Sequence, residues 1–280
     1  MSGAILVLSG GGAKAAAHCG AVRAVRERGI EPARYVATSL GAVVAAALAS
    51  GADPDTVVRA LMNEAPAGLR PHPLAAVAGI YLQGLVRARP FREAIGRIIT
   101  ARSFAELRVP ITVTAVDVNK LELIAFGHGG IDAPLLDVLA ASCALPPYFP
   151  AVSLDGRLLR DGGLMGHLPL AVVGETGGLP VIAVDVGPGF DSGREPRPPG
   201  GPPLIRAVDE SIGILMAQVA EEQVARWRRE RGRILYVRPR VERDATFNTD
   251  RARVYADEGY LAMREALDGL DSMAQPTRLP

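Results

Sequence analysis

The sequence predicts an α/β protein whose core is a sheet of buried, mainly parallel strands. Residues 4–8 and 35–38 are short apolar runs, and each leads directly into a segment with the composition of a helix. Residues 111–117 and 181–186 have the same strand-like character. Strands that are buried on both faces read as continuous apolar runs, and their alternation with helices is typical of a parallel sheet.

Apolar spacing and turn residues place the other elements. Asp53-Pro54 has the form of a helix start, and residues 152–160 read as a hairpin around the turn Asp155-Gly156. Shorter strands are predicted over residues 121–126 and 233–240, and helices over residues 15–28, 41–50, 90–99, 135–142, 204–231 and 254–267.

The chain shows no internal repeat and no change of composition, so we expect one domain over residues 1–280. Its core is expected at residues 4–186 and a C-terminal helix-strand-helix at residues 204–267. The Pro/Gly-rich loop at residues 187–203 and the tail at residues 268–280 are expected to be flexible.

Composition and charge argue against several classes of protein, among them nucleic-acid-binding, membrane-spanning and metal-binding proteins. The 280 residues are 49% hydrophobic with a formal net charge of +1, which is ordinary for a soluble globular protein and offers no basic excess for nucleic acid. The N-terminus lacks the pattern of a signal peptide, and no apolar run is long enough to cross a bilayer. Cys19, Cys143 and the four histidines form no metal-ligand pattern, so we expect two buried thiols, a cytoplasmic location and no metal or cofactor.

Residues 35–42 contain the candidate nucleophile. A serine at an abrupt strand-to-helix turn has an exposed hydroxyl beside the free amides of the new helix, as in a nucleophile elbow. Such a turn brings the strand and helix backbones close together and needs small residues two positions away, which Ala37 and Gly41 provide. Ser39 is therefore the candidate nucleophile, and a plain helix N-cap at Thr38 or Ser39 is the alternative.

A glycine-rich loop joins the first strand to the first helix, and such a loop presents free N–H groups to an anion. A Walker A loop is excluded because the Gly-x-x-x-x-Gly-Lys-Ser/Thr spacing is absent. A dinucleotide fingerprint fits loosely as Gly10-x-Gly12-x-x-Ala15. That fingerprint also needs an acidic residue at the end of the second strand, where this chain has threonine and serine.

The remaining role for this loop is an oxyanion hole made by Gly10, Gly11 and Gly12. In that role the N–H groups of Gly11 and Gly12 stabilise the charge on a tetrahedral acyl intermediate. Lys14 either adds positive field as a supporting residue or lies in solvent in the first helical turn.

The predicted hairpin leads to the candidate partner of Ser39. Its second strand ends at Asp161, which Gly162 and Gly163 follow. Because glycines allow backbone conformations that other residues resist, they let the carboxylate point inward. An aspartate that only completes its own turn is the alternative.

Together these motifs resemble the patatin-like phospholipase family. The family's oxyanion loop, Gly-Gly-Gly-x-Arg/Lys-Gly, matches residues 10–15, and its Gly-x-Ser-x-Gly elbow matches residues 37–41. The Asp-Gly-Gly/Ala motif matches residues 161–163, and residues 141–150 are similar to the helix-and-proline segment before the hairpin. Each motif is modest, but their order and spacing are jointly specific.

The resemblance covers roughly residues 5–186 and implies a three-layer α/β/α fold with a Ser-Asp dyad that hydrolyses acyl esters of lipids. In that mechanism Asp161 accepts the proton of Ser39 as it attacks the carbonyl, the glycine loop holds the oxyanion, and water releases the acyl group. An aspartate is a poor base at neutral pH unless burial raises its pKa, so we expect Asp161 to be partly buried.

Three positions depart from the family pattern. Ala15 and Ala37 stand where the family has glycine, and an added methyl group could tighten the oxyanion loop or the elbow. We expect both to be tolerated because alanine is the smallest change. His167 stands where the family often has asparagine, and we expect it to hold its loop.

Other functions remain open at this point. An acyltransferase would use the same acyl-enzyme with an alcohol or thiol in place of water, and acyl release measured with and without acceptors separates the two. A third possible function is that of a catalytically impaired homologue that only binds lipid. A Ser-His-Asp triad of the α/β-hydrolase kind is excluded, because it needs a histidine late in the chain and the last one is His167.

The expected partner is a lipid or another ester, with peripheral contact to a membrane. Residues 66–89 form an apolar segment broken by proline and glycine, which either admits a lipid tail or simply covers the core. Residues 226–229 either rest on anionic lipid or form a solvated helix end. Phospholipid, lysophospholipid, neutral glyceride and short soluble ester all remain candidate substrates.

Overall fold

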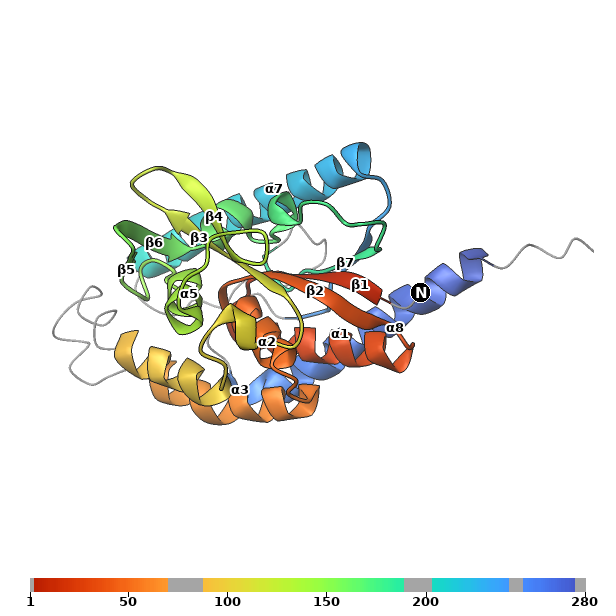
Figure 1. The fold of residues 1–280 in the computed structure, drawn as a ribbon, viewed down its shortest axis with the longest axis horizontal. Coiled ribbons are helices and arrows are strands. Elements are labelled where there is room, and N and C mark those ends of the chain that lie inside the picture. Colours follow the sequence, from red (N-terminus) through yellow and green to blue (C-terminus); the bar gives the residue numbers. More distant parts are fainter. Residues whose placement is uncertain (1–2, 70–87, 189–202, 242–248, 275–280) are drawn as a thin grey trace, which may run out of the picture.

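The computed structural model describes residues 3–69, 88–188, 203–241 and 249–274. These residues form a central, mostly parallel sheet flanked by helices, which confirms the predicted α/β fold (Figure 1). The strands are β1 (Gly3–Leu8), β2 (Glu31–Thr38), β3 (Ile111–Asp117), β4 (Glu122–Gly127), β5 (Val152–Leu154), β6 (Arg157–Asp161), β7 (Val181–Val184) and β8 (Leu235–Val237).

The sheet has the order β5-β6-β3-β2-β1-β7-β8, and β4 also pairs with β3. Strands β3, β2, β1, β7 and β8 run parallel to one another. Strands β4 and β6 pair antiparallel with β3, and β5 pairs antiparallel with β6. The carboxyl ends of parallel strands meet at one edge of a sheet. The loops that follow β1, β2 and β7 therefore lie together.

Helices cover both faces of this sheet (Figure 1). The longer helices are α1 (Ala16–Glu27), α2 (Ser39–Ala49), α3 (Pro54–Leu69), residues 88–98, α5 (Leu135–Ser142), α7 (Pro203–Glu230) and α8 (Ala252–Ala274). The short turns are η1 (Gly12–Ala15), η2 (Phe104–Glu106), α6 (Gly163–Gly166), η3 (Leu170–Val172) and η5 (Thr249–Arg251).

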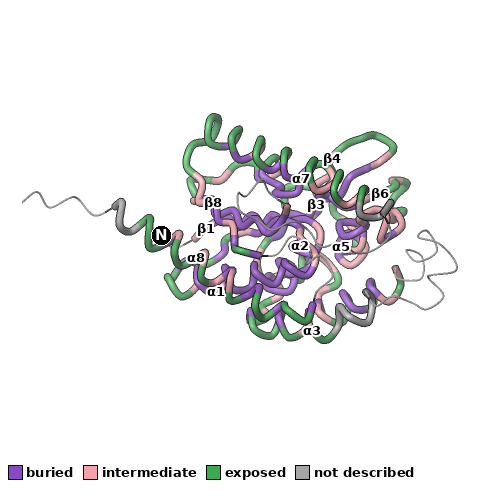
Figure 2. The backbone as a smooth tube through the Cα atoms, turned by 180° about the vertical axis from the view of Figure 1, so that it is seen from behind, coloured by how far each residue is buried: buried purple, intermediate pink, exposed green. Residues whose placement is uncertain are grey.

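Strand β1 shows how the two sides of the core divide. Successive side chains of a strand point to opposite faces, so Leu6 and Leu8 pack with α1, α2 and α8, whereas Ile5 and Val7 pack with α7. Every residue of α2 after Ser39 is buried, as its small apolar composition predicts. Figure 2 shows the resulting buried centre, with the outer turns of α3 and α7 exposed.

Several boundaries differ from the predictions. Helix α3 continues through Pro66 to Leu69, because a proline removes one main-chain hydrogen bond without by itself ending a helix. Helix α8 continues past Asp268 to Ala274, where we expected a loose tail, since an established helix gains one hydrogen bond for each added residue. The expected loop at residues 187–203 lies largely outside the described residues.

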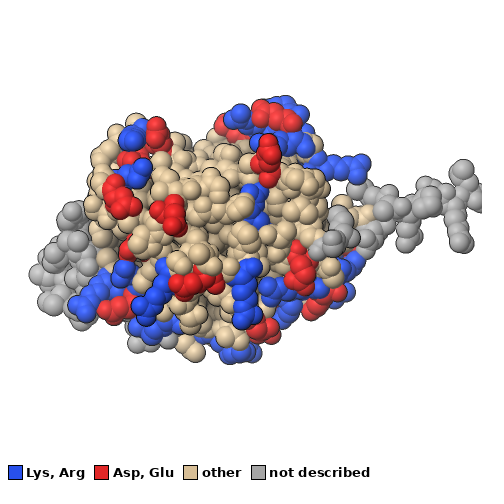
Figure 3. Space-filling model, in the orientation of Figure 1, with Lys and Arg blue, Asp and Glu red and all other residues tan. Residues whose placement is uncertain are grey.

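The sequence suggested membrane contact for two segments, residues 66–89 and residues 226–229, and the structure describes only the second in full. Most of the expected apolar flap, residues 70–87, lies outside the described residues. At the end of α7, Trp227 is buried, Arg226 pairs with Glu230, and Arg231 lies over the indole ring. Trp227 is therefore packed against the protein rather than placed at a membrane interface. Charged side chains of both signs gather at this end of α7 (Figure 3). No helix in the described ranges is long and apolar enough to cross a membrane.

Helices α1 and α8 pack with their backbones in direct contact. A Cβ atom on Gly259 would lie 1.9 Å from the carbonyl oxygen of Ala17, and one on Gly20 would lie 1.7 Å from that of Ala256. Neither distance leaves room for a methyl group, so the two glycines set the separation of the helices. This packing holds α8 against the helix that follows the glycine loop.

We predict that Gly259→Ala lowers the free energy of unfolding by about 1–3 kcal/mol, because the methyl group must push α8 away from α1. Gly269→Ala on the same helix is the matched control, since nothing lies within 4 Å of its Cβ position. That change should stabilise by up to about 1 kcal/mol through helix propensity. Urea unfolding measures both; equal stability of the two variants would contradict the packing.

Candidate active site

Ser39 lies at the junction of β2 and α2, and its backbone is strained. Its φ of 53° is in the left-handed region, which costs a residue with a side chain about 1–3 kcal/mol. The amide of Ser39 donates a 2.8 Å hydrogen bond to Ser142 Oγ at the end of α5. Thr38 makes no side-chain cap to α2. These features favour a nucleophile elbow over a plain N-cap.

The small residues around the elbow are needed for different reasons. A Cβ atom on Gly41 would lie 2.2 Å from the carbonyl oxygen of Ser9, so only glycine fits where α2 passes the end of β1. Ala37 lies within β2, and Ala15 has φ −58° and ψ −17°. Both alanines therefore have backbone conformations that any residue adopts, and neither departure from the family pattern imposes backbone strain.

Asp161 reaches Ser39 because β2 and β6 share one edge of β3. Strand β2 pairs with the first half of β3 and ends with Thr38 opposite Thr114. Strand β6 runs the other way along the second half and ends with Asp161 opposite Ala115. The two strands therefore meet end to end. Ser39 Oγ donates a 2.7 Å hydrogen bond to Asp161 Oδ2.

The carboxyl group of Asp161 is buried, and its hydrogen bonds offset only part of the cost of burying its charge. Burial raises its pKa to about 6, although the hydrogen bonds from Ser39 and from the Gly163 amide and the charge of His167 each act to lower it. The Gly163 amide donates to Asp161 Oδ1 at 2.8 Å. A carboxylate with a pKa near 6 is a better base at neutral pH than an ordinary aspartate.

The two glycines after Asp161 serve close packing rather than unusual conformation, which corrects the reason that we expected. Gly162 has φ −62° and ψ −26°, values that any residue adopts. A Cβ atom at Gly162 would lie 2.4 Å from Thr38 Oγ1 and 2.5 Å from the Thr114 carbonyl oxygen. A side chain at this position would therefore separate the turn from β2 and β3.

The glycine loop lies beside Ser39, but its three amides are not equivalent. A Cβ atom on Gly10 would lie 3.1 Å from Ser39 Cβ. The N–H group of Gly10 already donates a 3.1 Å hydrogen bond to the His167 carbonyl, so it is not the free oxyanion donor that we expected. Gly11 and Gly12 donate no hydrogen bond to any other described residue, and Gly12 has φ 58°.

Lys14 is buried in η1 with 3% of its surface exposed, so the alternative of a solvated lysine is wrong. Ser142 and Cys143 are site residues to which the sequence analysis assigned no role. The Cys143 thiol contacts Ser39, and burial raises the pKa of this thiol well above its ordinary value. Contacts between residues about a hundred positions apart have no local sequence signal.

Cys19 and Cys143 are both free and buried, as predicted. Within the described ranges, no group of three or more His, Cys, Asp or Glu side chains is placed to hold a metal ion. The described polar groups in contact with Ser39 include the Asp161 carboxylate, the Ser142 hydroxyl and the Cys143 thiol.

This sequence is similar to those of several known proteins. A sequence model described as patatin-like phospholipase matches residues 6–173. An uncharacterized NTE family protein of Mycobacterium bovis is 30% identical over 183 residues, which cover 65% of this chain and 48% of that protein. The lysophospholipase NTE1 of Mycosarcoma maydis is 24% identical over 286 residues, which cover 95% of this chain and 15% of that protein.

The crystal structure of VipD from Legionella pneumophila aligns with a TM-score of 0.49 and 14% identity, over 96% of this chain and 67% of VipD. The chain spans about half the length of the mycobacterial relative. The family match covers more than half of the chain and includes the glycine loop, the elbow and Asp161. The chain therefore belongs to the patatin-like phospholipase family.

Proposed function

We propose that this protein hydrolyses carboxylic ester bonds of lipids through an acyl-enzyme formed on Ser39. The main support is the 2.7 Å hydrogen bond from Ser39 Oγ to Asp161 Oδ2, at a strained elbow beside the glycine loop. Family membership supports a lipid ester as the substrate class. The lysophospholipase name of one relative is consistent with a phospholipid or lysophospholipid.

Acylation begins when Asp161 takes the proton of Ser39 Oγ as this oxygen attacks the ester carbonyl carbon. The carbonyl oxygen becomes an oxyanion in the tetrahedral intermediate. When the intermediate collapses, the ester bond breaks and the departing alcohol takes the proton from Asp161. The fatty acyl group then remains on Ser39.

The oxyanion donors in this proposal are the amides of Gly11 and Gly12. The amide of Ser39 is already bonded to Ser142, and that of Gly10 is bonded to His167. Gly11 and Gly12 are the loop amides without a partner among the described residues. Buried Lys14 is a supporting residue of the loop. Each oxyanion donor of this kind typically contributes about a hundredfold or more in rate.

Deacylation reverses the roles with water in place of the alcohol. Asp161 accepts a proton from the attacking water, and its conjugate acid returns that proton to Ser39 Oγ as the acyl-enzyme bond breaks. The products are a fatty acid and the free enzyme. No redox partner is needed, because no atom changes oxidation state in ester hydrolysis.

The surroundings of the site support a lipid substrate that is reached from a membrane surface. Met165 on α6 and Ile214 and Leu215 on α7 are exposed large apolar side chains. Helix α7 lies close to the site, since a Cβ atom on Gly163 would lie 3.2 Å from Met216 Cε. We propose a cytoplasmic enzyme in which residues 1–280 fold as one domain and which contacts membranes peripherally.

We predict that Ser39→Ala lowers kcat with a short p-nitrophenyl ester by about a thousandfold or more, because no nucleophile remains. A fluorophosphonate probe should modify the wild type at Ser39 and leave the variant unlabelled, as peptide mass mapping would show. Ser153→Ala, which changes an exposed serine in β5, is the matched control with normal labelling. Normal turnover by Ser39→Ala would falsify the assignment.

We predict that kcat/KM rises about tenfold per pH unit up to about pH 6 and is level above it. Protonated Asp161 cannot accept the serine proton, and burial places this pKa at about 6. The rate of fluorophosphonate labelling should follow the same curve between pH 4.5 and 8. A profile that stays flat across pH 6 would remove Asp161 from the role of base.

We predict that Asp161→Asn inactivates the protein yet stabilises it at pH 8. The pKa of Asp161 is raised in the folded state, so ionisation of this carboxyl destabilises the fold as pH rises through about 4 to 6. A rise of about two pKa units corresponds to about 3 kcal/mol. Unfolding by urea should show this gain at pH 8 and little gain at pH 4. A variant that is less stable than the wild type at pH 8 would contradict it.

A further inference from the structure

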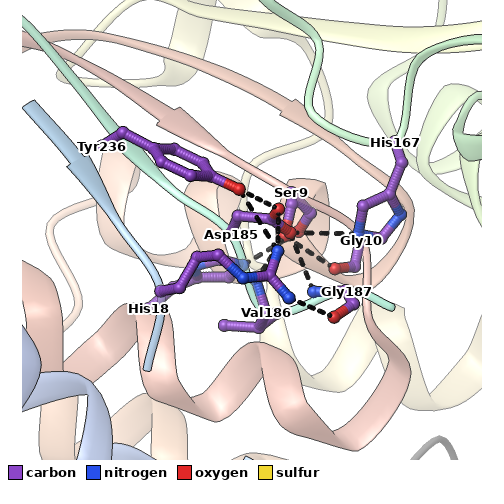
Figure 4. Close-up of polar contacts among 9 residues, drawn as sticks. Ser9, Gly10, His18, His167, Asp185, Val186, Gly187 and Tyr236 are labelled. Atoms are coloured by element: carbon purple, nitrogen blue, oxygen red, sulfur yellow. Dashed lines mark hydrogen bonds and ion pairs between the residues drawn. The ribbon is translucent and has the colours of Figure 1, made fainter. Parts of the chain in front are cut away.

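A second buried polar cluster lies against the glycine loop (Figure 4). This Asp185 cluster consists of His167, Asp185, Tyr236 and Arg238. Asp185 Oδ2 accepts hydrogen bonds from Tyr236 Oη at 2.8 Å and from Arg238 Nη1. Asp185 Oδ1 accepts the Gly187 amide at 2.9 Å and lies 3.4 Å from His167 Nε2. The cluster joins the ends of β7 and β8 to the segment after α6.

The surroundings of Asp185 keep its carboxylate ionised. Burial alone would raise the pKa of Asp185, but His167, the Arg238 guanidinium and the Gly187 amide hold it well below its ordinary value. His167 Nε2 is buried without a hydrogen-bond partner among the described residues and lies 3.4 Å from Asp185 Oδ1, so the carboxylate acts on the ring as a nearby charge rather than through a close hydrogen bond. The fixed negative charge therefore orients the imidazole ring.

His167 contacts the glycine loop through its backbone and its ring. Its carbonyl accepts the Gly10 amide at 3.1 Å, and a Cβ atom on Gly10 would lie 3.4 Å from ring atoms Cε1 and Nδ1. On the other side, a Cβ atom on Gly187 would lie 1.6 Å from His167 Nε2. The ring thus lies close to both Gly187 and Gly10, and the Cβ position of Gly10 is also 3.1 Å from Ser39 Cβ.

The end of β7 supports the same loop. Ser9 Oγ accepts the Val186 amide at 2.9 Å and donates to the Gly10 carbonyl at 2.8 Å. A Cβ atom on Gly11 would lie 2.7 Å from Val186 Cγ2. Because the His167 carbonyl accepts the Gly10 amide, a shift of His167 would move Gly10, and the amide of Gly11 would move with it.

We infer that His167 is a positioning residue of the proposed reaction: held by Asp185, it fixes Gly10 so that the Gly11 and Gly12 amides stay aimed at the oxyanion. This inference rests on the proposed function of Ser39 and Asp161. Oxyanion donors act in the transition state, so their displacement lowers kcat more than it changes KM. A histidine that only fills space would affect stability alone.

The test compares His167→Leu, which keeps bulk without a donor, with His167→Gln, whose amide can reach Asp185. With p-nitrophenyl butyrate, kcat of the leucine variant should fall about a hundredfold below wild type, with KM within about threefold. The kcat of the glutamine variant should be at least about tenfold higher than that of the leucine variant. His128→Leu and His128→Gln are matched controls at an exposed histidine and should keep wild-type kcat. Circular dichroism and urea unfolding verify the fold of each variant.

Unchanged kcat in a folded His167→Leu would overturn the inference, and so would a loss of stability and activity that glutamine does not recover. Should the leucine variant not fold, Asp185→Asn gives the second measurement, because it keeps the shape and removes the charge that orients the ring. Its kcat should fall at least about tenfold, and an unchanged kcat would overturn the inference. Fluorophosphonate labelling of wild-type Ser39 tests the proposed function separately.

Discussion

The end-to-end meeting of β2 and β6 along one edge of β3 is the constraint on which the site depends. The parallel strand brings Ser39 from one direction, and the antiparallel strand brings Asp161 from the other. Neither side chain has to reach far, because the sheet itself sets the 2.7 Å separation of their oxygens. Gly162 allows this meeting, since any side chain there would contact β2 and β3.

This arrangement places an ionisable carboxyl where burial disfavours its charged form. Two hydrogen bonds, from Ser39 and from Gly163, compensate the burial of Asp161 only in part. Asp185 is equally buried, yet it is surrounded by an arginine, a histidine and an amide and stays ionised. The contrast separates the proposed base, Asp161, from a fixed structural charge, Asp185, within the same site.

Local sequence patterns predicted the strands and turns whose formation depends mainly on residues that are neighbours in the sequence. The apolar runs predicted the strands, and the turn residues predicted both the elbow at Ser39 and the hairpin before Asp161. The patterns could not show which amide of the glycine loop is already bonded, because the acceptor on His167 is far away in the chain. The burial of Lys14 and the Asp185 cluster likewise depend on tertiary packing that has no periodic signal.

Strand β1 lies in the middle of the sheet, between β2 and β7, although it is the first strand of the chain. Its second partner is separated from it by more than a hundred residues, so one row of its backbone donors and acceptors stays unpaired until β7 has been made. A hydrophobic strand with an open edge readily pairs with other chains. Long-range pairing of this kind is also slow. During synthesis this protein therefore passes through a stage in which a central hydrophobic strand has an unpaired edge, and the chain is prone to aggregation at that stage.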